Sequence, residues 1–325
     1  MKPGLPFIAC AIPLLCLSPM DGCASGQTAP GRQYAATAIE IPRFDSTRAF
    51  AFLTLQTALG PRVPGSASHD QCIRQLIDSL RTKADTVIVQ EFPHLHPRLG
   101  RLRLTNVVAR FLPSLTKRLM LTAHWDSRPW ADSDPSETNR SKPVPGANDG
   151  ASGVAVLLEL AAQFRLHPPP VGIDVVLFDE EDAGTSGDLS SWCIGSRYFA
   201  SHLPNGFTCR AAVNLDMVGD RFLQIRREQR SDQLARDILD RVFAAAAETG
   251  AAAFIDEPGD SVFDDHVVLN SVGIPAVDLI DFDYTENGRS FWHTVDDLPA
   301  HCSAASLHEV GTVLLNLIYR HGPLM

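Results

Sequence analysis

The sequence has no cluster of positive charge. Its 325 residues include 38 Asp and Glu but only 28 Lys and Arg, which gives a formal net charge of −10. No basic run is longer than the pair Arg226-Arg227. Because nucleic-acid binding requires a clustered basic surface that neutralises phosphates, this composition excludes DNA and RNA as partners.

Long apolar runs and repeats are also absent. After the N-terminal leader, no apolar run reaches the roughly 18 residues that a transmembrane helix needs. Heptads and internal repeats are missing, and a chain with 45% hydrophobic and 20% charged residues is neither disordered nor collagen-like. A chain of this length can bury a large core, so it does not need disulfides or metals merely to fold.

Cysteine shows neither a metal-binding nor a disulfide pattern. None of the seven cysteines forms a CxxC pair, and three of them (Cys10, Cys16 and Cys23) fall in the first 23 residues. We expect the other four to be small buried side chains, although the sequence leaves their pairing open. These four are Cys72, Cys193, Cys209 and Cys302.

The N-terminus predicts an exported protein. Lys2 is followed by an apolar run over residues 5–17 and then by small and polar residues, the order found in secretory signal peptides. The tripeptide Gly22-Cys23-Ala24 also resembles the cleavage box of bacterial lipoproteins, in which Cys23 would carry the lipid. We therefore expect a signal peptide over residues 1–23 and a location in the periplasm or cell envelope. A lipid on Cys23 would be the only membrane contact, and plain secretion stays open as the alternative.

The rest of the chain predicts one α/β domain after a tether. Residues 24–42 are rich in Gly, Ala, Thr and Pro, and no linker divides residues 43–325. Near-continuous apolar runs such as residues 172–178 are typical of strands buried on both faces. We expect Ser231 to cap the fifth helix and Gly250 to end it. The expected strands are 86–92, 102–111, 118–123, 172–178, 210–218 and 274–282, and the expected helices are 44–59, 68–83, 151–164, 195–202, 231–249 and 303–319.

This alternation of strands and helices predicts the fold class. Helices that connect parallel strands cover both faces of a sheet. We therefore expect a single-domain, three-layer α/β/α fold with a central mixed, mostly parallel sheet. The long segment 125–148 would be a loop, and long loops in compact domains usually serve a function.

Ligating side chains occur at the ends of these strands and in two loops. Because the carboxyl ends of parallel strands meet at one edge of a sheet, we expect these side chains to lie close together. Each one alone has an ordinary structural explanation, such as a turn at residues 148–150 or a solvated edge at residues 179–182. The set comprises His124, Asp149, the acidic run 179–182, Asp216, Asp278 and His293.

Together these residues predict a metal site. Asp216 and Asp278 are carboxylates inside apolar strands, where an unpaired charge is costly. Too few basic residues lie near these strands to neutralise the acidic set, whereas a divalent cation would do so. Two histidines with three carboxylates form a nitrogen and oxygen ligand set that suits zinc. Glu181 and Asp182 offer a general base and a metal ligand on adjacent residues.

Seven short motifs follow one another along the body: AHWDSRP (123–129), GANDGASG (146–153), FDEED (178–182), GSR (195–197), LDMVG (215–219), DDH (264–266) and FWHTVDD (291–297). Their sequences and order resemble the zinc-dependent M28 aminopeptidase superfamily, and within it the glutaminyl cyclases, particularly the bacterial form. The WHT and DDH segments resemble the cyclase branch more than the peptidase branch. The resemblance implies a zinc exopeptidase fold and a catalytic domain over residues 43–325.

The resemblance also implies a role for each candidate residue. Asp149, Asp182 and His293 would bind one zinc ion, and Glu181 would be the general acid and base. The remaining roles are hydrogen bonding near the substrate for Asp216 and Asp264, an aromatic wall for Trp292, and a second metal ligand in two-zinc relatives for His124.

The sequence departs from the animal cyclases at three places. Asp182 stands where they have Glu, and Asp278 stands where they have His; both residues look like the bacterial form. The aromatic-rich loop after the acidic pair is replaced by residues 183–192. We therefore take Trp192 and Asp278 as further candidates for contact with substrate.

The implied activity is that of a zinc-dependent glutaminyl-peptide cyclotransferase, an aminoacyltransferase that releases ammonia from N-terminal glutamine. Its expected partners are peptides or proteins with N-terminal Gln, and the expected form is a monomer with one zinc ion. Two alternatives stay open: a peptide-binding lipoprotein without activity, and a two-zinc aminopeptidase. The aminopeptidase would use His124, Asp149, Asp182, Asp216 and His293.

Overall fold

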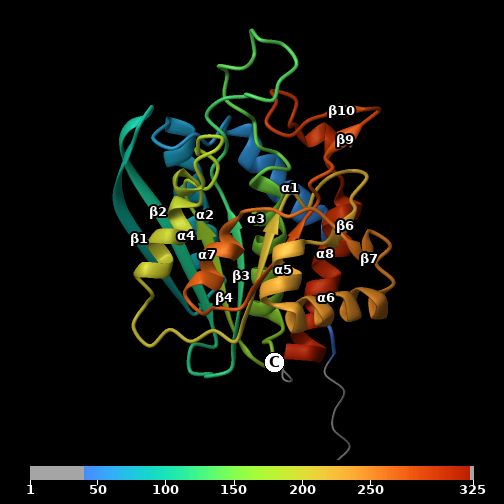
Figure 1. Cartoon of the computed structure of the whole chain (residues 1–325). Helices are drawn as coiled ribbons and strands as arrows, with labels where there is room; N and C mark the ends of the chain where they lie inside the picture. The colour runs from blue at the N-terminus through green and yellow to red at the C-terminus, as the bar shows by residue number, and fades with distance from the viewer. Residues whose placement is uncertain (1–39, 323–325) are drawn as a thin grey trace, which may run out of the picture. The chain divides into compact units, whose positions relative to one another are not determined.

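A six-stranded sheet forms the centre of the fold (Figure 1). The computed structural model describes residues 40–322, so the predicted signal peptide and residues 24–39 of the predicted tether lie outside the described part. The strands are hydrogen-bonded in the order β1-β2-β4-β3-β5-β8. Their bounds are Thr86–His96 for β1, Gly100–Phe111 for β2, Arg118–His124 for β3, Gly172–Phe178 for β4, Ala211–Asp216 for β5 and Ala276–Ile280 for β8.

Four neighbouring strands, β4, β3, β5 and β8, are parallel. β1 and β2 form an antiparallel hairpin, and β2 also pairs antiparallel with β4. The prediction of a mixed, mostly parallel sheet is confirmed. All four parallel strands end at one edge of the sheet, where His124 and Asp216 are the last residues of β3 and β5.

Helices cover both faces of this sheet and complete three layers (Figure 1). The large core cluster joins one face to α1, α2, α3, α6 and α8. A second cluster lies on the other face, where Phe199 of α4 and Leu269 of α7 belong to the same cluster as Met120 of β3. The bounds are Ser46–Ala58 for α1, Ala67–Arg81 for α2, Ala151–Leu166 for α3, Ile194–Ser201 for α4, Arg236–Thr249 for α6, Asp265–Ser271 for α7 and Ala304–Asn316 for α8.

Helix α3 approaches the sheet closely because Gly153 has no side chain. A Cβ at this position would lie 2.3 Å from the carbonyl oxygen of Leu215 and 3.0 Å from the Cβ of Ala123. Only glycine allows this backbone contact. The contact holds the start of α3, and Asp149 just before it, against β3 and β5.

The predicted helix over residues 231–249 is divided into α5 (Gln229–Leu234) and α6 by Ala235. Ser231 does not cap this segment, because the carboxylate of Glu228 caps α5 by accepting backbone N–H groups. The hydroxyl of Ser231 instead accepts the backbone N–H of Asp278 in β8 at 2.9 Å. Gly250 ends α6 with φ 71°, as predicted.

Several short elements did not stand out in the sequence, because fewer than eight residues show no clear periodicity. They include helix α7 at the edge of the site. The others are β6 (Ile225–Arg227), β7 (Phe254–Pro258), β9 (Thr285–Glu286), β10 (Arg289–Ser290), the 3-10 turns Leu189–Ser191 and Pro299–His301, and the π-helical turn Leu317–His321.

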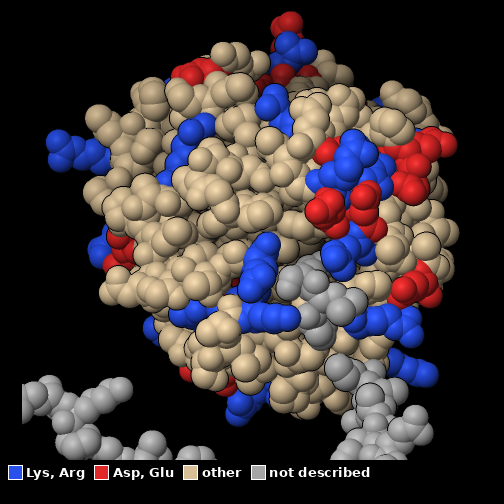
Figure 2. Space-filling view, turned by 60° about the horizontal axis from the view of Figure 1, so that its bottom comes forward, with Lys and Arg blue, Asp and Glu red and all other residues tan. Residues whose placement is uncertain are grey.

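The surface carries both basic and acidic residues. On the face that Figure 2 shows, some Lys and Arg side chains lie among acidic residues and others lie next to one another. The Arg226-Arg227 pair is neutralised, since Arg226 contacts Glu257 and Arg227 contacts Asp232, Asp240 and Asp256. No helix within residues 40–322 is long and apolar enough to cross a membrane. All four cysteines of this part are free thiols, three of them buried as expected.

A buried carboxylate and two arginines link strands β2, β3 and β4 at the edge of the sheet opposite the site. Asp174 lies inside the apolar strand β4 and is fully buried. Arg118, the first residue of β3, is also buried and donates to both oxygens of Asp174, at 2.8 and 2.7 Å. Arg110 of β2 donates to the same carboxylate at 2.9 Å. The pair therefore links three neighbouring strands.

We expect Arg118→Ala to lower the free energy of unfolding by about 3 kcal/mol, because removing one partner leaves a buried charge undercompensated. The matched control is Arg103→Ala, which breaks an exposed pair with Glu91 and should cost less than about 1 kcal/mol. Urea unfolding of the two variants measures the difference. Equal losses would show that the Asp174 pair does not support the sheet.

Candidate metal and catalytic site

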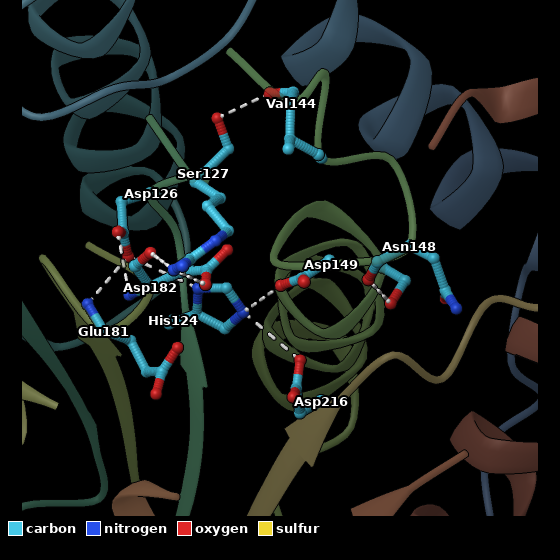
Figure 3. Close-up of polar contacts among 12 residues, drawn as sticks. His124, Asp126, Ser127, Val144, Asn148, Asp149, Glu181, Asp182 and Asp216 are labelled. Carbon is cyan, nitrogen blue, oxygen red and sulfur yellow. Dashed lines mark hydrogen bonds and ion pairs between the residues drawn. The ribbon is translucent and has the colours of Figure 1, made fainter. Parts of the chain in front are cut away.

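Five predicted ligand residues meet at the carboxyl edge of the sheet, and all of them except His293 are labelled in Figure 3. His124, the last residue of β3, lies between two of these carboxylates. The Nε2 atom of His124 is 3.1 Å from Asp149 Oδ1 and 3.2 Å from Asp216 Oδ1. On the other side of Asp149, Oδ2 is 3.6 Å from His293 Nε2. His293 Nε2 is also 3.1 Å from Asp182 Oδ1. The structure therefore brings together residues from two strand ends, a loop after β4, the start of α3 and the 291–297 loop.

Among residues 40–322, four groups of three side chains lie close enough together to bind a metal, and two of these groups share Asp149. Asp149, Asp182 and His293 form the first of these two sets. One ligand atom from each lies within 4.8 Å of the others, and all three residues are buried. Asp182 Oδ2 has no hydrogen-bond partner although it is buried, which is costly unless a cation completes its shell. Two carboxylates and an imidazole are suitable ligands for zinc and leave a position for substrate. The residues present fit a catalytic zinc ion.

His124, Asp149 and Asp216 form the second set and share Asp149 with the first. Burial lowers the pKa of His124, but hydrogen bonds with Asp126, Asp149 and Asp216 outweigh it and raise the pKa well above its ordinary value. Similarly, burial lowers the pKa of His293, whereas Asp182 and Asp132 raise it, to about 9. Both histidines are therefore surrounded by enough negative charge to hold a cation, whether a proton or a metal.

Acidic residues behind the ligands fix their orientation. Asp132 Oδ1 lies 3.5 Å from His293 Nδ1 and so leaves Nε2 for the metal. Asp126 is 3.3 Å from His124 Nδ1 and also accepts the backbone N–H groups of Glu181 and Asp182. Such partners behind metal ligands set ring orientation and affinity. Asp126 belongs to the AHWD motif, but nothing in that motif indicates its role.

Asp297 performs a similar function for Asp149. Its two carboxylate oxygens accept the backbone N–H groups of Asn148 and Asp149, at 2.8 and 3.2 Å. Tyr284 donates its hydroxyl to the same carboxylate at 3.1 Å. These bonds hold the turn before α3 in place. The only signal in the sequence was a second acidic residue at the end of the FWHTVDD motif.

Several backbone positions around the site are strained. Glu180, Cys193, Met217 and His293 all have φ between 46° and 59°, a region that residues other than glycine rarely occupy. Such positions persist only where surrounding contacts enforce them, and they cluster at functional sites. Three of these strained positions directly precede or follow Glu181 and Asp216 or are the candidate ligand His293 itself.

Glu181 lies beside the first metal set as the predicted base. Its side chain is buried, and Oε1 is 3.2 Å from the thiol sulfur of Cys193. Glu181, Cys193 and Asp264 each have an atom within 4.8 Å of the others. Burial and then the charge of Asp264 raise the pKa of Glu181 well above its ordinary value. In this environment the carboxylate has a strong tendency to take up a proton.

Comparison with known proteins agrees with this geometry. The model of peptidase family M28 matches residues 106–318. The chain belongs to peptidase family M28. The crystal structure of a glutaminyl cyclase from Bacteroides thetaiotaomicron, bound to N-acetylhistamine, is 36% identical, covers 86% of this chain and 99% of its own, and superposes with a TM-score of 0.83. The predicted zinc exopeptidase fold is thereby confirmed.

Other M28 relatives carry either of two names. A leucine aminopeptidase precursor from Bacteroides thetaiotaomicron is 35% identical over 87% of this chain and 99% of its own, with a TM-score of 0.83. A glutaminyl-peptide cyclotransferase-like protein from Bos taurus is 27% identical over 287 residues, 80% of this chain and 72% of its own length. The names of these relatives therefore include both alternatives that the sequence left open.

Two tryptophans lie beside His293 of the first set. Trp292 stacks on His293 with ring centroids 3.7 Å apart, and Trp192 lies nearly parallel to the same ring at 6.3 Å. Both are half-buried. Gly184 allows Trp192 this position, because a Cβ at Gly184 would lie 2.2 Å from the indole. The structure thus places both predicted wall residues beside the site, and their contact with substrate stays a prediction.

Asp264 and Asp278 are joined behind the site by a residue that the sequence did not single out. Asn214 donates to Asp264 Oδ2 at 2.7 Å and to Asp278 Oδ1 at 3.1 Å. Burial raises the pKa of Asp264 to about 6. Asp278 is fully buried and lies next to His266, which in turn contacts Glu228 at 3.2 Å. Asp278 therefore lies behind Asp264, and its predicted contact with substrate would be indirect.

We expect Asp297→Asn to weaken zinc binding by about 10- to 100-fold, because an amide cannot accept both backbone N–H groups before α3. Competition with a chromophoric chelator measures the affinity. The control is Asp296→Asn, since Asp296 contacts only the exposed Arg289 and the neighbouring loop. Unchanged affinity in Asp297→Asn would mean that Asp149 is held in place without this carboxylate.

Proposed function

We propose that this M28 protein is a zinc-dependent glutaminyl-peptide cyclotransferase, which converts N-terminal glutamine to pyroglutamate and releases ammonia. The observation that carries the proposal is the buried set Asp149, Asp182 and His293, with Glu181 next to Asp182 in the chain and with Trp192 and Trp292 beside His293. The glutaminyl cyclase from Bacteroides thetaiotaomicron, which matches this chain over nearly its whole length, supports the same assignment.

The site residues divide the reaction between them. Zinc, when bound by Asp149, Asp182 and His293, supplies a Lewis acid for the side-chain carbonyl oxygen of the glutamine. Glu181 accepts a proton as the α-amine attacks the γ-carbonyl carbon, and it returns the proton to the departing ammonia. Asp264 has a carboxylate oxygen within 4.8 Å of Glu181 and would hold the N–H groups of the substrate.

Ring closure is intramolecular, so orientation supplies much of the rate. The aromatic rings of Trp192 and Trp292 enclose the space beside His293 and exclude water from it. The predicted signal peptide fits substrates outside the cytoplasm, namely exported peptides and proteins that begin with Gln. Export, a lipid on Cys23 and a monomeric state are parts of this proposal that rest on the sequence and on the family resemblance.

A second candidate function has its own support. The set His124, Asp149 and Asp216 could bind another metal beside the first, which is the arrangement that a two-zinc aminopeptidase requires. The aminopeptidase name among the relatives agrees with it. Metal content separates the two functions: one zinc ion per chain is expected for the cyclotransferase, and two are expected for the aminopeptidase.

Mass spectrometry of two peptides tests the proposal. We expect purified, zinc-loaded protein without residues 1–23 to remove one ammonia from a peptide that begins with Gln and to leave a Leu-initiated peptide intact. Zinc measured on the same sample should be one ion per chain. Release of free Leu with two zinc ions would establish the aminopeptidase instead, and no change in either peptide would favour a binding protein.

We expect Glu181→Gln to lower kcat by at least about 100-fold with zinc still bound, because an amide cannot accept the proton. The neighbouring Glu180→Gln is the matched control. Glu180 is also buried, but its Oε1 faces His94 at 3.7 Å and it belongs to none of the candidate metal groups. Ammonia release and zinc content are measured for both variants, and full activity in Glu181→Gln would exclude Glu181 as the base.

A further inference from the structure

The thiol of Cys193 contacts the base of the proposed reaction. Its sulfur lies 3.2 Å from Glu181 Oε1, and Cys193 is fully buried. A protonated thiol is a donor and a carboxylate is an acceptor, so Cys193 donates and Glu181 accepts. Among residues 40–322, no other side chain donates a hydrogen bond to this carboxylate.

The backbone places this thiol accurately. Cys193 N–H donates to the carbonyl oxygen of Glu181 at 3.1 Å, and Ile194 N–H donates to that of Glu180 at 3.0 Å. Gly195 brings the two segments into direct backbone contact, because a Cβ there would lie 2.3 Å from the carbonyl oxygen of Asp179. The base and its donor therefore belong to one rigid unit that joins the end of β4 to the start of α4.

The surroundings of Cys193 differ from those of a cysteine that serves only as a small apolar side chain. Such a side chain would pack among hydrocarbon groups. The thiol of Cys193 instead faces Glu181, and Asp264 lies within 4.8 Å. Placing a carboxylate among other carboxylates is unfavourable, and a neutral donor is the one kind of neighbour that stabilises it without adding charge.

We propose that Cys193 is a positioning residue that holds Glu181 for proton transfer. Its S–H group occupies Oε1, so that Oε2 is the oxygen left to accept the proton of the substrate amine. This inference rests on the proposed function, because it assigns to Glu181 the role of base. Cys193 itself does not touch the reacting atoms.

Two substitutions separate the effect of the hydrogen-bond donor from the effect of side-chain size. Cys193→Ala removes the donor, whereas Cys193→Ser keeps a donor on a side chain of similar size. Both residues tolerate the positive φ of 59° better than a β-branched residue would. We expect kcat for the Gln peptide to fall about tenfold in Cys193→Ala, with KM and zinc content unchanged. Cys193→Ser should recover most of this loss.

The control is Cys209→Ala. The Cys209 thiol also donates a hydrogen bond of 3.2 Å, but to the backbone oxygen of Ala211, at the end of β5 opposite Asp216. It should leave kcat and KM unchanged. Equal kcat in Cys193→Ala and Cys193→Ser, whether both normal or both low, would overturn the proposal, since the donor would then make no difference.

Crystal structures of the zinc-loaded Cys193→Ala and Cys193→Ser variants give a readout that does not depend on activity. The Glu181 carboxylate should rotate away from its native position in Cys193→Ala and keep it in Cys193→Ser. An unmoved carboxylate in Cys193→Ala would refute the positioning role. If the wild-type protein releases Leu rather than ammonia, the proposed function fails, and the same variants are then compared on the Leu peptide.

Discussion

Crowding of buried carboxylates at one edge of the sheet is the constraint on which the site depends. Asp149, Asp182, Asp216, Glu181 and Asp264 all lie there, and the buried guanidinium of Arg128 contacts one of them, Asp182, at 3.4 Å. Burial raises the pKa of Asp216, Glu181 and Asp264, which shows how unfavourable their charged forms are without a cation. Metal binding and the stability of this edge are therefore coupled, and the same repulsion that destabilises the metal-free site favours a divalent ion.

The scaffold holds these groups together through the backbone more than through the side chains. Gly153 lets α3 press against β5, while Asp126 and Asp297 bind the N–H groups of the two turns that carry the metal ligands. Left-handed backbone at residues such as Met217 and His293 is maintained by this packing. The backbone strain and the charge repulsion both cost stability. Burial of the large hydrophobic core offsets these costs.

The sequence predicted the sheet and the ligand set because both depend on patterns that are local along the chain. Apolar runs revealed β4 and β5, and the family resemblance of the motifs implied Asp149, Asp182 and His293, which the structure brings together. What it missed depends on contacts between distant segments. Ser231 looked like a helix cap, but its hydroxyl bonds to β8, and helix α7 is too short to show a period. The partners behind the ligands and the donor to Glu181 have no signature in the sequence, because their roles come only from which backbone and side-chain atoms the fold brings within reach.

Asp149 presents one carboxylate oxygen to each metal set, Oδ1 to His124 and Oδ2 to His293. The two sets therefore cannot fill independently, since an ion in one withdraws negative charge from the other; their occupancies are thermodynamically linked. A protonated His124 is itself a cation in the second set, so protons and the second zinc ion compete for one place. The pH of the solution would then set the number of bound zinc ions. The single-zinc form would be favoured at lower pH, and the two-zinc form at higher pH and higher zinc concentration.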